Sequence, residues 1–511
     1  MFPGSSYGVA VTVARLHAPS AELMPAVPGE RDTRLDELLP AESLTDAELA
    51  REIDACTRIE ARLAAYKADR IAQLAARRSA ARDRQPGQPG AAPQRDERLP
   101  DDVSEFFPDE LAMILNCSRT AATVQTEVSL TLRHTLTRTW VAMTEGRIDP
   151  ARGRALALEL GAPARDTDPL IIAAVESAML PVATTMSVKR LRAETRKELV
   201  ARDAAAADRR RRQAARAADV VVRHLPDGIS QLVHTLPTPL ANAQLDAYDR
   251  YARMVKSDGD ERSLGQLRSM VAVELALRPW DTTRPPVTAS LTVLAPLGAL
   301  QGRTGSVADL DGQAITADHV RELLAALDAL TPDGLRAPAG GSVTVGVIDS
   351  DGALRAVATP DELRRLARRG CREHPDDASC GCSVLDRPPP VDRYRPSRSQ
   401  DRWVRTRDRG CRHPGCDNRA GWADLDHVVP HACGGSTDCA NLCCLCRRHH
   451  RLKTFAPGWR FVMEGDGTLS VTTPSGVTRS TRPPGLPALA EYWPVPSREL
   501  VQPEDDDPPP F

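Results

Sequence analysis

Two pairs of side chains that can bind a metal stand near the end of the chain. Cys411 and Cys416 flank a short Pro-Gly loop, and Cys446 precedes His449 by three positions in a segment of helical character. One loop pair and one helical pair can close a tetrahedral zinc site. Zinc bonds would replace a hydrophobic core that a segment of about 60 residues hardly builds alone. We therefore predict a structural zinc site at Cys411, Cys416, Cys446 and His449.

Cysteine distribution favours metal binding over disulfides. Ten of the 12 cysteines lie between Cys371 and Cys446. The N-terminal residues lack the pattern of a signal peptide, and no apolar run reaches the roughly 18 residues of a membrane span. Disulfide frameworks are typical of short secreted chains. We expect a cytoplasmic protein with metal-bound thiolates and no membrane partner.

Other cysteines and histidines leave alternatives open. Four side chains form a candidate second zinc site, or else a flexible loop with free thiols: Cys371, His374, Cys380 and Cys382. Cys443 and Cys444 are expected in the core, whereas Cys433 or Cys439 is an alternative zinc ligand. His413 and His431 are expected to be exposed, with contact between His431 and a catalytic ion as the alternative.

Four further residues have the chemistry of a hydrolase: Asp426, His427, Asn441 and His450. An imidazole is partly neutral near pH 7, so His427 can accept a proton from water. Neighbours in a strand point to opposite sides. At a strand end, Asp426 can therefore face a metal ion while His427 faces the attacking water.

The spacing of these residues resembles the HNH endonucleases, also called ββα-metal nucleases. The similarity rests on Asp426-His427-Val428-Val429-Pro430, on Gly434-Gly435, on Asn441-Leu442, and on Leu445-Cys446 followed by His449-His450. It covers roughly residues 400–460. In that family a first strand ends at the histidine, and a hairpin leads to the asparagine and then to a helix that carries the last histidine.

The resemblance implies a role for each of the four residues. His427 would be the general base, and Asn441 would fix its orientation and tautomer. Asp426 and His450 would hold one divalent ion (Mg²⁺, Mn²⁺, Ni²⁺ or Zn²⁺), which stabilises the charge of the transition state. The expected products carry a 5′ phosphate and a 3′ hydroxyl.

The net charge of the whole chain does not predict a DNA partner, but the charge of one segment does. The whole chain has a net charge of −2, whereas residues 401–453 hold 10 Lys and Arg against 6 Asp and Glu. Cations near the last histidine are expected to contact backbone phosphates: Arg447, Arg448, Arg451 and Lys453. A second basic run, Arg209–Arg212, is either another phosphate contact or a solvated helix face.

Residues 1–40 show no hydrophobic period and are expected to form a loose N-terminus. Thr45 and Glu48 form a capping box. A long helix to about Ser79 should follow, with an apolar face at Leu49, Ile53, Cys56, Ile59, Leu63, Tyr66 and Leu74. Residues 83–100 have the composition of a linker with nothing to bury, and residues 103–216 are expected to be mostly helical.

The middle of the chain changes to a period of two. Residues 219–225 and 229–236 predict a β-hairpin around Pro226-Asp227-Gly228. Residues 287–294 and 342–349 are further strand candidates. Helices are expected at 238–256 and 262–277. A third helix should begin at Thr359-Pro-Asp-Glu362, with the proline at its first position, and end at Gly370.

The N-terminal part is similar to a second family, the domain of unknown function 222, or 13E12 repeat family, found before HNH modules. The similarity rests on the helix at 46–79, residues 110–136, the PDGISQL hairpin and residues 262–275. It covers roughly residues 40–380. It implies a helical region that handles DNA or acts as a scaffold.

The expected fold is α+β, in several parts. A mostly α-helical N-terminal region and a smaller α+β middle part occupy residues 41–380. A Pro-rich linker (383–400) leads to a small zinc-stabilised ββα-metal domain (401–460), a short β-hairpin extension (461–481) and a Pro-rich acidic tail (482–511). We predict a metal-dependent DNA endonuclease. The rivals are a non-catalytic zinc-containing DNA-binding protein and a toxin or mobile-element protein with the same chemistry.

Overall fold

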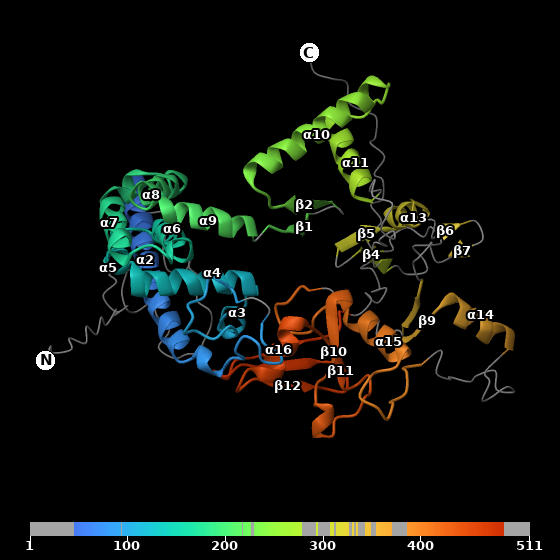
Figure 1. Ribbon diagram of the computed structural model, residues 1–511. Coiled ribbons are helices and arrows are strands. Elements are labelled where there is room, and N and C mark those ends of the chain that lie inside the picture. Colours follow the sequence, from blue (N-terminus) through green and yellow to red (C-terminus); the bar gives the residue numbers. More distant parts are fainter. Residues whose placement is uncertain are drawn as a thin grey trace, which may run out of the picture. The chain divides into compact units, whose positions relative to one another are not determined.

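The computed structural model shows a mixture of helices and small antiparallel sheets, compatible with the α+β expectation (Figure 1). It describes residues 45–92, 95–216, 218–225, 229–277, 386–418 and 420–484, with shorter stretches between: 293–294, 307–310, 313–326, 330–331, 334–335, 343–348 and 354–369. The chain divides into two compact units. The first ends at Arg216 and includes Phe455–Pro457, and the second holds the remainder.

The described part of the first unit is helical, as expected for residues 103–216. Its α-helices are α2 (Asp46–Ala76), α3 (Phe107–Leu115), α4 (Arg119–Leu130), α5 (Thr137–Thr144), α6 (Pro150–Leu160), α7 (Pro169–Met179), α8 (Val188–Arg202) and α9 (Ala204–Arg216). Shorter turns lie between them: η4 (Ala80–Arg82), η5 (Thr131–Thr135), η6 (Ala162–Ala164) and η7 (Leu180–Thr185). The basic run lies on α9, where Arg211 and Arg212 are exposed.

Helix α2 begins at the predicted capping box but buries a different face from the one expected. Thr45 and Glu48 exchange the two hydrogen bonds of the motif. Ile53 and Leu63 of the predicted apolar face are 68% and 59% exposed. Alanines take the inner side instead: Ala61, Ala65, Ala68, Ala72 and Ala75. Their small side chains allow close packing, and the Trp140 indole of α5 donates to the Ala65 carbonyl at 2.9 Å.

The segment 83–100 does bury side chains, so the expectation of an empty linker was wrong. Leu99 is 1% exposed. The Asp83 carboxylate accepts hydrogen bonds at 2.7 Å from the Ser104 hydroxyl and the Glu105 amide. Sequence composition missed these contacts because they join a polar loop to residues 21 and 22 positions further along.

The predicted hairpin and helices of the middle region are confirmed where the structure describes them. The first half of the second unit contains β1 (Val220–His224), β2 (Ser230–His234), α10 (Thr238–Ser257), α11 (Leu264–Leu277), β3 (Val293–Leu294), β4 (Val307–Leu310), β5 (Gln313–Thr316), α13 (Ala317–Ala326), β6 (Leu330–Thr331), β7 (Gly334–Leu335), β8 (Val345–Ile348), β9 (Leu354–Ala358) and α14 (Pro360–Arg369). β1 pairs with β2, and β8 with β9. None of the helices described is long and apolar enough to cross a membrane.

The end of the Pro-rich segment is tied to the elements that follow it. Val391 forms an isolated bridge with Thr437. Ser397 and Gln400 form a capping box at the start of α15 (Arg398–Asp408), so this helix begins before residue 401. Its Trp403 donates to the Arg355 carbonyl of β9 at 3.1 Å. These contacts place residues 391–408 beside the predicted zinc-binding module.

After α15 the chain forms a hairpin, a helix and a small sheet. The elements are η8 (Ala420–Trp422), β10 (Ala423–His427), η9 (His431–Cys433), β11 (Leu442–Cys446), α16 (Arg447–Phe455), β12 (Arg460–Met463), β13 (Leu469–Thr472) and β14 (Thr478–Thr481). β12, β13 and β14 form a three-stranded antiparallel sheet. The predicted hairpin extension at 461–481 therefore contains one strand more than expected.

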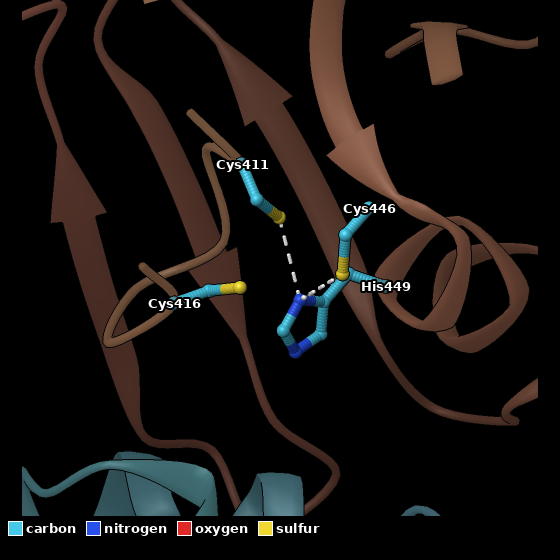
Figure 2. Close-up of side chains that lie close together, drawn as sticks. All are labelled: Cys411, Cys416, Cys446 and His449. Carbon is cyan, nitrogen blue, oxygen red and sulfur yellow. Dashed lines mark hydrogen bonds between the residues drawn. The ribbon is translucent and has the colours of Figure 1, made fainter. Parts of the chain in front are cut away.

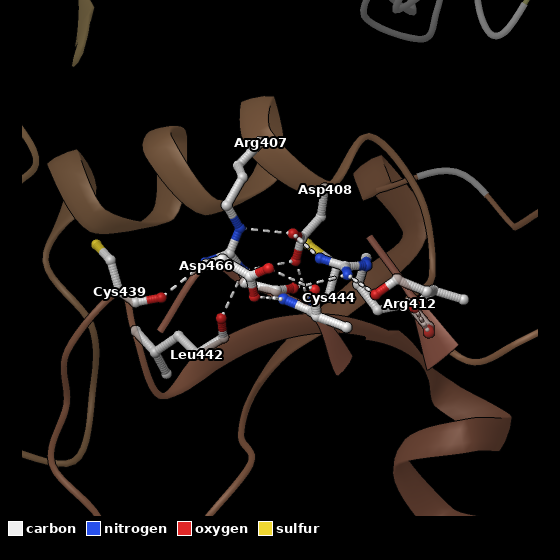
Figure 3. A network of polar contacts seen from close by, with 10 residues as sticks. Arg407, Asp408, Arg412, Cys439, Leu442, Cys444 and Asp466 are labelled. Atoms are coloured by element: carbon white, nitrogen blue, oxygen red, sulfur yellow. Dashed lines mark hydrogen bonds and ion pairs between the residues drawn. The ribbon is translucent and has the colours of Figure 1, made fainter. Parts of the chain in front are cut away.

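A buried group of charges holds these elements together (Figure 3). The Asp408 carboxylate at the end of α15 pairs with Arg407 at 2.7 Å and with Arg412 at 2.9 Å. It also accepts the Cys444 amide of β11 at 2.8 Å. Arg412 continues to the carbonyls of Gly467 and Thr481, at 2.9 and 2.7 Å.

We predict that Asp408→Asn destabilises the second unit by about 3–5 kcal/mol, because it leaves two arginines buried without their counter-charge. Unfolding in urea, followed by tryptophan fluorescence, measures the loss. Asp401→Asn on the same helix is the matched control. Its ion pair with Arg405 is partly exposed, so removing it should cost about 1 kcal/mol or less. Equal losses in the two variants would contradict a structural role for the buried charges.

Candidate metal centre and active site

A strand pair followed by a helix positions the predicted site residues. β10 and β11 are antiparallel, with Asp426 opposite Cys443 and His427 opposite Leu442. His427 ends β10, Asn441 immediately precedes β11, and α16 follows Cys446 without a break. The expected order of strand, hairpin and helix is thus present. Cys446 is the last residue of β11, however, and not a helical residue as we expected.

Four side chains converge at the junction of β11 and α16 (Figure 2). The ligand atoms of Cys411, Cys416, Cys446 and His449 all lie within 4.8 Å of one another. His449 turns its Nδ1 toward the sulfur atoms of Cys411 and Cys446, at 3.3 and 3.2 Å. Bond lengths to zinc of about 2.3 Å for sulfur and 2.0–2.1 Å for nitrogen fit such a cluster. These four residues can therefore hold a structural metal such as zinc.

The thiols of this cluster are electrostatically linked. The hydrogen bond with Cys416 raises the pKa of Cys411, and hydrogen bonds from Cys411 and Cys416 lower the pKa of Cys446. Sulfur atoms held so close share protons unevenly, because one thiolate is stabilised by its protonated neighbours. A metal cation relieves this crowding by binding thiolates directly.

His413 is a covering side chain, which corrects our expectation that it is exposed. It is 3% exposed. Its ring lies parallel to that of His449, with centroids 3.8 Å apart and an angle of 2°. Trp459 and Phe461 lie beyond it, at 5.8 and 6.3 Å. The stack covers one face of the His449 ring, which sequence spacing gave no reason to expect.

The remaining cysteines of the module lie outside the cluster. Cys443 and Cys444 are fully buried, as expected. Cys439 packs in a core with Trp403 and Val404, and burial raises the pKa of its thiol to about 11. A neutral thiol in an apolar core is a poor metal ligand, and Cys433 is exposed in the loop. Neither alternative zinc ligand is supported.

A second group of polar side chains lies between β10 and α16. The His450 Nδ1 is 2.9 Å from an oxygen of Asp424, and its Nε2 is 3.7 Å from Asp426. Asp424 is two residues before Asp426 and shares its face of β10, since side chains alternate along a strand. A hydrogen bond from Nδ1 to a carboxylate leaves Nε2 free to coordinate a metal.

The surroundings of Asp424 favour its ionised carboxylate. Burial alone would raise the pKa of Asp424, but the hydrogen bonds from His450 and Arg447 lower it below its ordinary value. The buried Asp426 Oδ2 accepts no hydrogen bond among the described residues, and the Lys453 ammonium lies 3.0 Å away. The Asp426 carboxylate therefore has an ion pair with Lys453 on one oxygen and the His450 Nε2 near the other. A buried carboxylate beside an imidazole nitrogen has the donor atoms that suit a divalent cation.

The His427 ring contacts three side chains outside this group. Its Nε2 lies 2.9 Å from the Thr437 hydroxyl. The Tyr394 ring stacks on it, with centroids 5.4 Å apart, and the exposed His431 lies edge-on at 5.6 Å. Burial lowers the pKa of His427, against the opposing effect of the Asp426 carboxylate. The neutral imidazole, which can accept a proton, is favoured as a result.

The hydrogen bonds of the Asn441 side chain go to the backbone of the loop, whereas the resemblance implied that Asn441 orients the His427 ring. Its side-chain oxygen accepts the Val429 amide at 2.8 Å, and its nitrogen donates to the carbonyls of Val429 and Ser436. Gly435 fits the same loop because an added Cβ would meet the Val429 carbonyl oxygen at 1.9 Å. Asn441 therefore fixes the loop backbone that follows His427.

The cations of α16 differ in their access to solvent. Arg447 is exposed and pairs with Asp424 at 3.2 Å. Arg448 is half-buried and Arg451 is buried. Lys453 donates to the His427 carbonyl at 2.6 Å and faces Asp426. Arg451 is buried and Lys453 bonds inside the module, so of the four cations Arg447 is the most accessible to DNA phosphates. The phosphate contacts themselves stay a prediction.

Sequence reasoning missed Asp424, Thr437 and Tyr394. The position of Asp424, two residues before Asp426 on a strand, was a usable signal. Tyr394 had none, because its contact with His427 joins segments that are distant along the chain. Thr437 lies between Gly435 and Asn441, but nothing in its spacing pointed to the His427 ring. The candidate second cluster of Cys371, His374, Cys380 and Cys382 lies outside the described residues.

Comparisons with known proteins give relatives without an assigned activity. The chain is 38% identical over 155 residues to Uncharacterized protein Rv3776 of Mycobacterium tuberculosis, a match covering 30% of this chain and 28% of the relative. It is 37% identical over 179 residues to Uncharacterized protein Rv2100 of the same organism, covering 34% and 30%. These matches span less than a third of the length of either relative. No family model and no solved structure matches.

We predict that Cys446→Ser removes one zinc atom per chain, because the variant lacks the ligand at the β11–α16 junction. Elemental analysis of the purified protein measures the loss. Cys433→Ser, which alters an exposed thiol of the same module, should keep the full zinc content. If the two variants held equal amounts of zinc, the assignment of Cys446 would fail. A wild-type content of two atoms would further support the cluster at Cys371–Cys382.

Proposed function

We propose that this protein is a metal-dependent DNA endonuclease of the HNH type, which hydrolyses phosphodiester bonds to 5′-phosphate and 3′-hydroxyl ends. The single observation that carries the proposal is the pair of histidines around the end of β10. His427 is buried and favours its neutral form, while His450 turns Nε2 toward Asp426. A zinc knuckle that only binds DNA needs neither arrangement.

In this proposal the general base and the metal ligand lie on opposite faces of β10. His427 accepts a proton from the attacking water. Asp426 and His450 would hold one divalent ion, which would supply charge stabilisation at the scissile phosphate and its leaving oxygen. Asp424 orients the His450 ring through Nδ1, and Asn441 fixes the loop after His427. The ammonium of Lys453 holds Asp426 from the side of α16.

The remaining parts have supporting roles in the proposal. Zinc at Cys411, Cys416, Cys446 and His449 stabilises the module, and the exposed Arg447 contributes to binding of the DNA backbone. The region that resembles the domain of unknown function 222 positions the DNA or regulates cutting. The protein would act in the cytoplasm, where thiolates stay reduced.

We predict that purified protein nicks supercoiled plasmid when Mg²⁺, Mn²⁺ or Ni²⁺ is added, and that EDTA prevents nicking. His427→Ala should abolish it because the water loses its proton acceptor, while zinc content stays at the wild-type value. His234→Ala, at an exposed histidine of β2, is the control and should cut normally. Gel electrophoresis of the plasmid forms gives the rates.

Two outcomes would overturn parts of this proposal. Binding of DNA by wild type and variant without cutting under any metal would favour the non-catalytic DNA-binding protein. Equal cutting by wild type and His427→Ala would remove His427 from the mechanism. Toxicity on expression would separate a toxin from other biological roles that use the same chemistry.

We predict that Asp424→Asn weakens the binding of the catalytic ion and leaves the general base, His427, intact. Loss of the carboxylate that orients a metal-bound histidine typically costs about 10–100-fold in metal affinity. The Mn²⁺ concentration for half-maximal nicking should rise by this factor, and the rate should recover at saturating metal. Asp417→Asn, an exposed carboxylate of the zinc-binding loop, should leave the metal dependence unchanged. An unaltered Mn²⁺ titration of Asp424→Asn would exclude the orienting role.

A further inference from the structure

Thr437 lies at the centre of a short chain of hydrogen bonds beside His427. It is 1% exposed. Its hydroxyl is 2.9 Å from the His427 Nε2 and donates to the Arg393 carbonyl at 2.6 Å. Its own carbonyl accepts the Val391 amide at 3.0 Å and the Gln400 side chain at 2.9 Å. The backbone of Thr437 is therefore fixed from two sides, and its hydroxyl has one place to lie.

The directions of these bonds follow from a count of protons. A threonine hydroxyl has one proton to donate, and a backbone carbonyl can only accept. Since the Thr437 proton goes to the Arg393 carbonyl, the contact with His427 needs a proton on Nε2. The neutral ring then carries its lone pair on Nδ1.

We propose that Thr437 is a positioning residue that sets the tautomer of His427, so that Nδ1 is the nitrogen that accepts the proton of water. This inference rests on the proposed nuclease function and deepens it. The role of orienting the base thus belongs to Thr437 rather than to Asn441. It also gives a function to the Pro-rich segment, because Arg393 and Val391 hold Thr437 in place.

Stacking and hydrogen bonding constrain different motions of the His427 ring. Tyr394 covers one face of the ring, with an angle of 21° between the planes. Stacking fixes the plane of an imidazole but leaves both ring orientations and both tautomers available. The bond to Thr437 removes this freedom by binding one edge. A change that deletes only the hydroxyl should therefore impair the chemical step and spare DNA binding.

Kinetics of three variants tests the positioning role. Thr437→Val should lower kcat for plasmid nicking about 100-fold, the typical effect of a misplaced catalytic group, without changing KM. Thr437→Ser keeps the hydroxyl and should restore most of the rate. Thr472→Val, the same change on β13, where the hydroxyl bonds to Thr478, is the control for the substitution itself. Nicking by Thr437→Val at the wild-type kcat, in a preparation where His427→Ala is inactive, would overturn the inference and leave the nuclease proposal standing.

A direct reading of the tautomer is independent of cutting. Two-bond ¹H–¹⁵N spectra of wild-type protein labelled at its 11 histidines distinguish protonated from bare ring nitrogens, and His427→Ala identifies the His427 signals by their disappearance. A proton on Nε2 and a bare Nδ1 would support the inference even in a protein that cuts nothing. A proton on Nδ1 would overturn it, whatever the activity of the Thr437 variants.

Discussion

The metal-ligand cluster at the end of β11 is the constraint on which the rest of the module depends. Cys446 is the last residue of β11 and His449 lies on the first turn of α16, so a metal bound to both would fix the angle at which this helix leaves the strand. Successive helical residues point about 100° apart. His449 can thus face the cysteines while His450 faces Asp424 and Asp426. A single helix can serve a structural metal and a catalytic ion because two adjacent histidines diverge.

Buried charge supplements the cluster on its other side. Asp408 joins α15 to β11, and Arg412 extends the connection to the sheet of β12–β14. Replacing such a network with apolar side chains often costs little stability. Its hydrogen bonds to the carbonyls of Gly467 and Thr481 are directional, however, and they determine how the β12–β14 sheet lies against β11. Only 4% of the residues are aromatic, so a metal at the cluster, together with the buried charges, would supplement a core that has few large side chains.

Local patterns predicted much of the fold, and contacts between distant segments explain what they missed. Capping at Thr45, the pairing of β1 with β2 and each pair of candidate metal ligands follow from short spacing, because a few neighbouring residues determine each feature. The buried face of α2 was mispredicted because alanine has a weak hydrophobic signal, although it packs closely. His413, Asp424 and Thr437 acquire their roles from partners that folding brings near. The resemblance to HNH nucleases implied that Asn441 orients His427, whereas the hydrogen bond to the His427 ring joins it to Thr437.

The central claim is that one helix presents histidines to two separate metals. Anomalous diffraction from crystals grown with Mn²⁺, recorded around the zinc and manganese absorption edges, tests it most directly. The account predicts a zinc peak among Cys411, Cys416, Cys446 and His449, and a manganese peak bonded to Asp426 and the Nε2 of His450. An occupied zinc site accompanied by manganese that touches neither Asp426 nor His450 would contradict it.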